Sequence, residues 1–260
     1  MISTVLLSIT TIINGQDMDF NILSSFLFHP RKSYQEMDKK DIQINVGDSI
    51  LVSSRFHLIS KSAPTILFFH GNGEIATEYD DIARVYNQKN INFIIADFRG
   101  YGFSTGTPDV ENTQSDAHFV LDYILKYLKE KNYSGSLNLM GRSLGSVSVL
   151  ELAKRYPHDF SGLIIESGFA DEEPLFKLIG TTAEQAGFTK QDGFLNGDKL
   201  KNMPDHFLSF TQSRIILYLS ARGSFCILLA PPKIKNFFPF PMPIIIISLA
   251  LVFRSTLKRW

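Results

Sequence analysis

Cysteine is almost absent from this chain, because Cys226 is the only one among its 260 residues. The chain therefore cannot form an internal disulfide bond or a cysteine-rich metal site. It also lacks the clustered His and Asp residues that a metal site would need, so we expect no metal and no other cofactor. A reducing compartment is compatible with this composition, and we expect a cytoplasmic protein.

An excess of charge of either sign is also missing. The chain holds 26 basic and 26 acidic residues, which gives a formal net charge of zero. Proteins that bind nucleic acids usually present a basic surface, so we expect no nucleic-acid partner.

Long apolar runs are missing as well. The apolar stretch 243–253 has 11 residues, whereas a membrane-spanning helix needs roughly 20. Residues 1–13 are apolar too, but they lack the basic segment and the small-residue cleavage site of a secretory signal. We therefore expect no membrane span.

What the chain does contain is a regular alternation of apolar strands and helices, over a length that suits one α/β domain. Strands are expected at 42–46, 50–58, 65–69, 91–97, 137–140 and 162–166, and helices at 79–88, 110–131 and 147–155. In the long helix, the expected buried stripe consists of Phe119, Leu121, Ile124 and Leu128. This pattern predicts a mostly parallel sheet with helices on both faces.

Residues 141–145 read GRSLG, between an apolar strand and a helix. This is the G-x-S-x-G pattern in the strand–turn–helix context of a nucleophile elbow. The sharp turn lifts the Ser143 hydroxyl clear of the sheet, and the free N–H of Leu144 at the helix start can stabilise an oxyanion. The simpler alternative is a Gly/Ser turn that leads into a helix.

Two further motifs follow strands upstream. Residues 70–74 read HGNGE, and residues 97–106 read DFRGYGFSTG. The first fits a loop whose backbone N–H would pair with that of Leu144 to hold an oxyanion, although a Gly-rich turn would look the same. Within these motifs, we interpret His70 as loop structure rather than as a catalytic base, Asp97 and Arg99 as braces of the loop, and Gly71 as a source of backbone freedom.

Taken together, these three motifs resemble those of the α/β-hydrolase superfamily, nearest its serine-aminopeptidase-like and acyl-thioesterase-like branch. The resemblance runs from about residue 18 to about residue 203, which makes residues 1–17 an N-terminal extension. It implies an α/β-hydrolase fold that hydrolyses an ester, thioester or amide bond of a small-molecule acyl substrate through an acyl-enzyme. Ser143 would be the nucleophile, with the N–H groups of Leu144 and of Asn72 or Gly73 as the oxyanion hole.

The composition changes in the tail, residues 204–260. The tail holds one acid, Asp205, and seven basic residues: Arg214, Arg222, Lys233, Lys235, Arg254, Lys258 and Arg259. It has no steady period of 2 or 3.6 residues. A hydrolase of this kind should place its last two strands here, with the acid and then the histidine of its catalytic triad. Neither residue stands at a matching position, so we expect the last two strands to be lost.

The genetic code offers an explanation for this tail. When codons are formed from the third base of each residue and the first two bases of the next, residues 210–220 permit HAExDHIIPF and residues 239–247 permit IPNADHNN. In the resembling family, H-G/A-E-x-D-x-I-I-P carries the triad acid and P-x-A-x-H carries the triad histidine. We infer that the reading frame slips near residues 200–204 and that 204–260 is an out-of-frame tail after an incomplete core, 18–203.

The consequence is a hydrolase scaffold with neither triad acid nor triad histidine in frame. Within the frame, Glu166 remains open as a substitute acid, and one of the six histidines remains open as a substitute base. The alternative function is a non-catalytic product, either of a pseudogene or as a binding module on the hydrolase scaffold.

Overall fold

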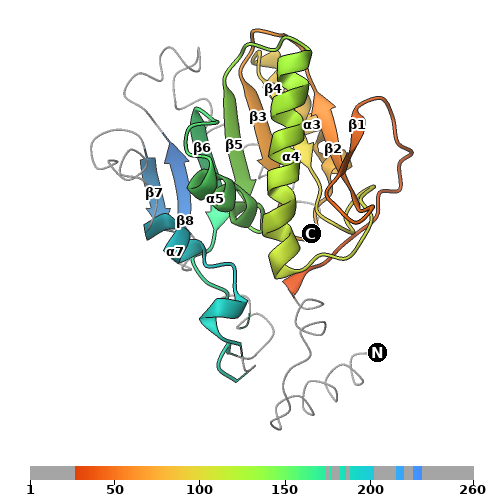
Figure 1. Cartoon of the computed structure of the whole chain (residues 1–260). Helices are drawn as coiled ribbons and strands as arrows, with labels where there is room; N and C mark the ends of the chain where they lie inside the picture. Colours follow the sequence, from red (N-terminus) through yellow and green to blue (C-terminus); the bar gives the residue numbers. More distant parts are fainter. Residues whose placement is uncertain are drawn as a thin grey trace.

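The computed structural model (Figure 1) describes residues 27–173, 176, 182–185, 188–201, 215–219 and 225–229. An eight-stranded sheet with strand order β1-β2-β4-β3-β5-β6-β8-β7 forms its centre. The strands are β1 (Asp41–Asn45), β2 (Leu51–His57), β3 (Thr65–Phe69), β4 (Asn92–Ala96), β5 (Leu137–Arg142), β6 (Gly162–Gly168), β7 (Ile215–Leu219) and β8 (Phe225–Leu229).

The four central strands are parallel. β3 pairs in parallel with β4 on one side and with β5 on the other, and β5 continues to β6. β1 and β2 form an antiparallel hairpin whose second strand joins β4, also antiparallel. The carboxyl ends of β3, β4, β5 and β6 therefore lie along one edge of the sheet, where ligands bind in open α/β sheets.

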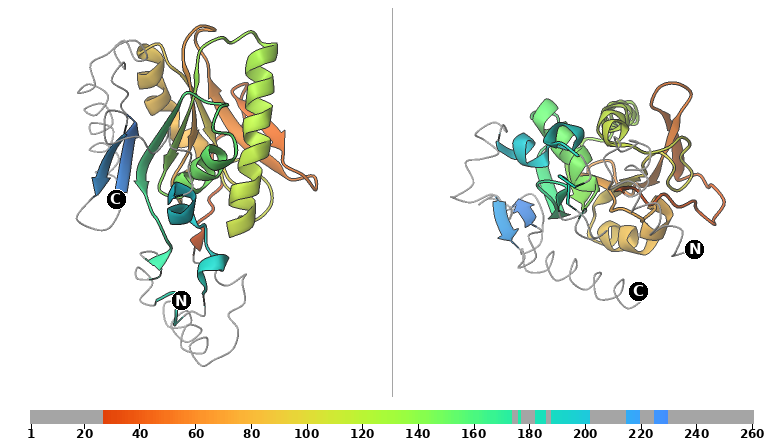
Figure 2. Two further views of the ribbon diagram at one scale, coloured as in Figure 1. Left: turned by 60° about the vertical axis from the view of Figure 1, so that its left-hand side comes forward. Right: turned by 90° about the horizontal axis from the view of Figure 1, so that it is seen from below.

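Helices cover both faces of the sheet, as Figure 2 shows. One face carries α4 (Val110–Glu130) and α5 (Gly145–Arg155), and the other carries the 3-10 turn η1 (Ala76–Tyr79) and α3 (Asp80–Gln88). Two shorter elements follow β6, η2 (Lys190–Asp192) and α7 (Asn196–Lys201). The predicted α/β-hydrolase architecture, a mostly parallel sheet between helices, is confirmed.

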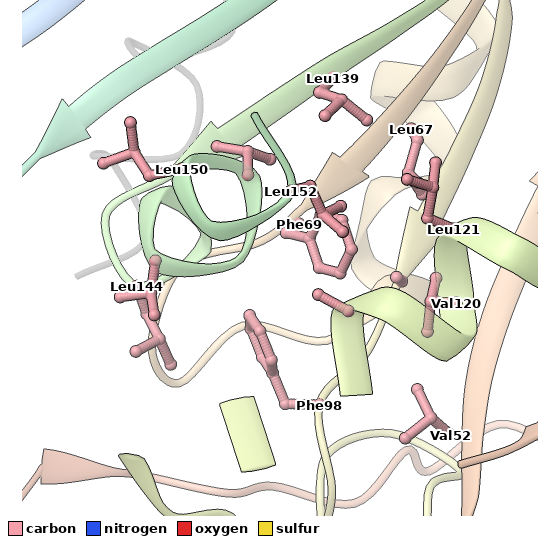
Figure 3. Packing of buried hydrophobic residues seen from close by; sticks show 14 of the residues in the cluster. Val52, Leu67, Phe69, Phe98, Val120, Leu121, Leu139, Leu144, Leu150 and Leu152 are labelled. Carbon is pink, nitrogen blue, oxygen red and sulfur yellow. The ribbon is translucent and has the colours of Figure 1, made fainter. Parts of the chain in front are cut away.

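The core is divided by the sheet into two apolar layers. Figure 3 shows the larger one, where Leu67, Phe69 and Leu139 of the strands pack against side chains of α4 and α5. The smaller layer lies between the sheet and η1 with α3, and Phe68 and Phe93 stack within it, 5.5 Å apart. Alternate residues of one strand thus serve opposite layers, which is why these strands read as continuous apolar runs.

The start of α4 is fixed by a capping box. The Asp109 carboxylate accepts a hydrogen bond from the Asn112 backbone N–H, and the Asn112 side chain accepts one from the Asp109 N–H. Leu121, Ile124 and Leu128 of this helix are buried as predicted, but Phe119 is 46% exposed and that prediction was wrong. The buried stripe instead passes through Ala117 and Val120, which lie beside Leu121 on the same helix face.

The tail departs from its expected structure at two places. We expected the last two strands of the sheet to be lost, yet β7 and β8 are present as an antiparallel hairpin at the edge of β6. The sequences IILYL and FCILL are β-prone, and the free edge of β6 can accept a strand. The pairing with β6 is irregular and antiparallel, unlike the parallel pairing of the central strands.

The rest of 204–260, including the second shifted-frame motif at 239–247, lies outside the described residues, as does the extension 1–17. Of the first shifted-frame motif, 210–220, the structure describes 215–219, which form β7. Among the helices that the structure describes, none has the length and apolar character to cross a membrane.

Candidate active site

The turn at Ser143 is built by two glycines. β5 ends at Arg142, Ser143 follows with φ +48°, and α5 begins at Gly145. A Cβ on Gly145 would lie 1.9 Å from the carbonyl oxygen of Phe69, and one on Gly141 would lie 2.4 Å from the carbonyl oxygen of Gly145. Neither position can hold a side chain, because α5 starts directly against β3 and β5.

Hydrogen bonds hold Ser143 in its left-handed conformation, which costs a non-glycine residue on the order of 1–3 kcal/mol. Its backbone N–H donates to the Glu166 carbonyl oxygen at 2.8 Å. Its own carbonyl oxygen accepts the N–H of Ser146 at 2.9 Å and the hydroxyl of Ser146 at 2.6 Å. Ser143 itself remains partly exposed, so the turn presents its side chain at the carboxyl edge of the sheet.

The loop at residues 70–74 lies beside this turn. It follows β3, and Gly145 packs against the last carbonyl groups of that strand. The Tyr101 hydroxyl oxygen accepts a hydrogen bond from the Gly73 backbone N–H. In contrast, the backbone N–H groups of Asn72 and Leu144 donate to no acceptor among the described residues. Of the two sequence candidates, Asn72 thus has the free donor.

The Asn72 side chain anchors this loop from the other direction. Its Oδ1 accepts the Tyr101 hydroxyl at 2.6 Å and the His29 backbone N–H at 2.8 Å, and its Nδ2 donates to the Leu27 carbonyl oxygen at 2.9 Å. The amide therefore fixes the loop to segments far away in the sequence, while its own backbone N–H stays available.

His70 is fully buried, and both of its ring nitrogens face oxygen atoms. Nδ1 lies 2.8 Å from the Gly71 carbonyl oxygen and Nε2 lies 3.1 Å from Asp97 Oδ1. Asp97 Oδ1 also accepts the Ala76 backbone N–H, so this carboxylate joins the end of β4 to η1. These contacts fit loop support and leave no ring nitrogen free to take the proton of a serine.

Arg99 and Gly102 shape the loop after β4. Arg99 forms a two-pronged ion pair with Asp116 of α4, with both distances 2.7 Å. A Cβ on Gly102 would lie 2.1 Å from Asp97 Oδ2, so a side chain there would displace the carboxylate that holds His70. The loop is therefore braced by charge on one side and packed without space on the other.

The sequence interpretation missed one ion pair, between Glu74 and Arg142. Glu74 Oε1 lies 2.6 Å from an Arg142 guanidinium nitrogen. Glu74 Oε2 accepts the Gly71 backbone N–H at 2.7 Å and the Tyr79 hydroxyl at 2.5 Å. The signal was present, because two motifs that meet at one sheet edge carry one acid and one base, but nothing in the sequence said that these two side chains point to the same side.

Glu166 lies next to this pair rather than next to a histidine. It is the register partner of Arg142 on β6. Burial raises the pKa of Glu166 to about 7, against the opposing effect of Arg142. His57, His70 and His118 pair with other carboxylates, those of Asp80, Asp97 and Glu151. The structure thus gives no support to Glu166 as a substitute triad acid.

Over the described ranges, no group of three or more His, Cys, Asp or Glu residues is arranged to hold a metal ion.

Comparison with known proteins identifies the family. A family model described as "Serine aminopeptidase, S33" matches residues 60–192, a segment that contains all three motifs. Protein bem46 from Schizosaccharomyces pombe is 28% identical over 195 residues, which cover 69% of this chain and 62% of that protein. Lysophosphatidylserine lipase ABHD12 from Bos taurus is 31% identical over 120 residues, which cover 44% of this chain and 29% of that protein.

A solved structure of a soluble variant of monoglyceride lipase from Saccharomyces cerevisiae is also similar. It is 22% identical, with a TM-score of 0.44, over 53% of this chain and 47% of that one. The matched segments span less than two thirds of each of these three proteins. Because the family model covers half of the chain with its motifs in order, the chain belongs to the serine aminopeptidase S33 family of α/β-hydrolases.

Proposed function

We propose that this scaffold is that of a serine hydrolase, which cleaves an ester, thioester or amide bond through an acyl-enzyme at Ser143. The observation that carries the proposal is the partly exposed serine at φ +48°, beside the two unused N–H groups of Leu144 and Asn72. A strained serine next to two free donors is the arrangement that acyl transfer needs.

In the proposed reaction, the Ser143 oxygen attacks the acyl carbonyl carbon while its proton passes to a base. The carbonyl oxygen becomes an oxyanion, which the N–H groups of Leu144 and Asn72 stabilise. Collapse of this intermediate expels the alcohol, thiol or amine, which takes up the proton, and leaves an acyl ester on Ser143. Water then repeats the sequence and releases the acid.

Neither in-frame substitute supplies the base for the first step in the part of the chain that the structure describes. His70 is occupied by Gly71 and Asp97, and Glu166 lies beside Arg142. The shifted reading frame permits both missing motifs in order, so we propose that residues after about 203 come from a slipped frame. Such a chain keeps only the residual catalysis of substrate binding and the oxyanion hole.

A small-molecule acyl ester is the best first substrate. ABHD12 is named for lipase activity on a lysophospholipid, and its similarity to this chain supports ester chemistry at Ser143. The proposal names no particular acyl chain or leaving group, because the described residues between 169 and 201 show no pattern typical of one ligand.

The competing function is a non-catalytic product, of a pseudogene or as a binding module on the same scaffold. The two are separated by DNA sequencing across codons 195–250, followed by assay of the chain and of a version with the frame restored. We expect an insertion or deletion in the DNA, and hydrolysis of a short-chain p-nitrophenyl ester by the restored protein alone. A general base typically contributes ~10²–10⁴-fold, so the difference should be large.

Equal, Ser143-dependent hydrolysis by both proteins would refute the loss of the base. No hydrolysis by either would favour the non-catalytic alternative.

A further inference from the structure

One carboxylate connects the two loops that supply the proposed oxyanion donors. Glu74 closes the loop of Asn72, and its Oε1 lies 2.6 Å from the guanidinium of Arg142, the residue directly before Ser143. Its Oε2 accepts the backbone N–H of Gly71, the residue directly before Asn72. Glu74 therefore links Arg142, the neighbour of Ser143 in the sequence, to Gly71, the neighbour of Asn72.

The surroundings make this ion pair stronger than a surface pair. The side chains of Arg142 and Glu74 are 25% and 23% exposed, so water screens them only in part. Tyr79 donates its hydroxyl to Glu74, and Glu166 faces Arg142 from the neighbouring strand. With one partner removed, the other would remain as a half-buried charge, which is costly.

Side-chain contacts add to the backbone hydrogen bonds that hold both loops. Ser143 stays at a strained φ only while its surroundings enforce it. The Asn72 loop is irregular, and the Gly71 N–H depends on Glu74 as its acceptor. A working oxyanion hole needs its donors within about 0.5 Å of the productive geometry.

We propose that Glu74 and Arg142 are positioning residues, whose ion pair sets the distance between the Asn72 and Leu144 N–H donors. The inference rests on the proposed function for its catalytic consequence, whereas the mechanical coupling of the two loops stands on the contacts themselves. Neither side chain touches the substrate in this role; both act through the backbone next to them.

Hydrogen exchange of the full chain tests the coupling directly. Glu74→Gln keeps an oxygen for the Gly71 N–H but removes the charge, and Arg142→Met keeps the side-chain length without the charge. We expect each substitution to speed exchange at least several-fold in both loops, 70–74 and 141–146, with no change in β4. Arg142→Lys should restore most of the protection.

The matched control is Arg84→Met on α3, which breaks an ion pair with Asp81 whose side chains are 73% and 86% exposed. It should leave both loops unchanged. If Glu74→Gln speeds exchange only in its own loop, the coupling is refuted. If Glu74→Gln also speeds exchange in β4, that variant is unfolding as a whole. The comparison of Arg142→Met with Arg142→Lys then decides: faster exchange in both loops for the first and restored protection for the second support the coupling, and any other result refutes it.

Labelling by a fluorophosphonate tests the catalytic consequence. Its rate separates into a reversible binding constant and a maximal rate of bond formation at Ser143. Loss of one oxyanion donor typically costs about 10²–10³-fold, so a misplaced donor should lower the maximal rate by about 10-fold or more and leave the binding constant within twofold. Altered exchange with an unchanged maximal rate would overturn the positioning role.

The exchange and labelling experiments distinguish failure of the loop coupling from failure of the proposed function. If neither the unsubstituted chain nor the chain with its frame restored forms a Ser143 adduct, the proposed function fails, while the exchange experiment still decides whether Glu74 and Arg142 couple the loops.

Discussion

Gly145 packs directly onto the carbonyl oxygen of Phe69, at a distance where no side-chain atom fits: a Cβ there would lie 1.9 Å from that oxygen. The contact joins the first residue of α5 to the last residue of β3. It brings the Ser143 turn against the loop that follows β3, and so assembles the candidate site from segments about 70 residues apart.

Replacement of Gly145 by alanine should therefore destabilise the protein more than alanine at an open glycine. We expect Gly145→Ala to lower the free energy of unfolding by roughly 1–3 kcal/mol, because overpacking forces backbone shifts. Gly47→Ala is the control, since it has left-handed φ but nothing within 4 Å of the new Cβ, and it should cost roughly 1–2 kcal/mol. Urea unfolding of both variants measures the difference; a smaller loss at Gly145 than at Gly47 would contradict the packing argument.

Ser143 should be the one serine that a fluorophosphonate labels. We expect slow labelling that disappears in Ser143→Ala, because the proposed site has the oxyanion donors but not the base. Ser146→Ala is an informative comparison: it removes the hydroxyl that bonds the Ser143 carbonyl oxygen and should slow labelling without abolishing it. Intact-mass spectrometry measures the rates, and an adduct that survives Ser143→Ala would disprove the elbow assignment.

Glu166 should make the protein less stable as pH rises. Burial raises the pKa of this carboxyl from 4.5 to about 7 in the folded chain. The folded state then binds more protons than the unfolded state between these values, so its stabilising contribution is complete below pH 4.5 and is lost as pH rises through about 7. Melting temperatures between pH 4.5 and 7.5 should fall with this slope.

In Glu166→Gln the fall of the melting temperature with pH should be smaller, by the amount that one titrating carboxyl group contributes. Glu130→Gln, at the exposed end of α4, is the control and should keep the slope of the parent chain. An unchanged slope in Glu166→Gln would mean that Glu166 ionises alike in both states.

Lys199 and Glu151 should respond unequally to loss of the partner. Lys199 of α7 is only 4% exposed, and its Nζ lies 3.0 Å from Glu151 and 2.5 Å from Gln114 Oε1. Burial lowers the pKa of Lys199, while Glu151 opposes this change. Glu151→Gln leaves the more buried Lys199 cation without its paired anion and should cost about 3 kcal/mol or more, whereas Lys199→Met leaves the Glu151 carboxylate, which is 20% exposed, and should cost less.

Thermal unfolding of the two variants measures this asymmetry. Equal losses would indicate that the contact contributes through packing rather than charge.

The sequence was most informative where glycine and serine indicate sharp backbone turns. The GRSLG and HGNGE motifs predicted the turn at Ser143 and the loop beside it, because these residue types are needed wherever a chain turns sharply. Phe119 was misplaced because four residues of one helix cannot show which of two adjacent stripes faces the sheet. Glu74 and Arg142 were missed because register, not sequence spacing, decides that they meet.

The hairpin of β7 and β8 was missed for a different reason. Its two apolar runs are short, and strand formation there depends on the open edge of β6, a tertiary feature that no local pattern reveals.

The anchoring of Asn72 also has a consequence for the order in which parts of this molecule can fold. Its loop is held by Leu27, His29 and Tyr101, and its counterpart at Leu144 comes later still. These contacts are long-range, so they form only after much of the chain has been made and collapsed. All of them nevertheless precede residue 200. If the reading frame slips near residues 200–204 as proposed, every segment that anchors the two proposed oxyanion donors is still encoded in frame, upstream of the slip.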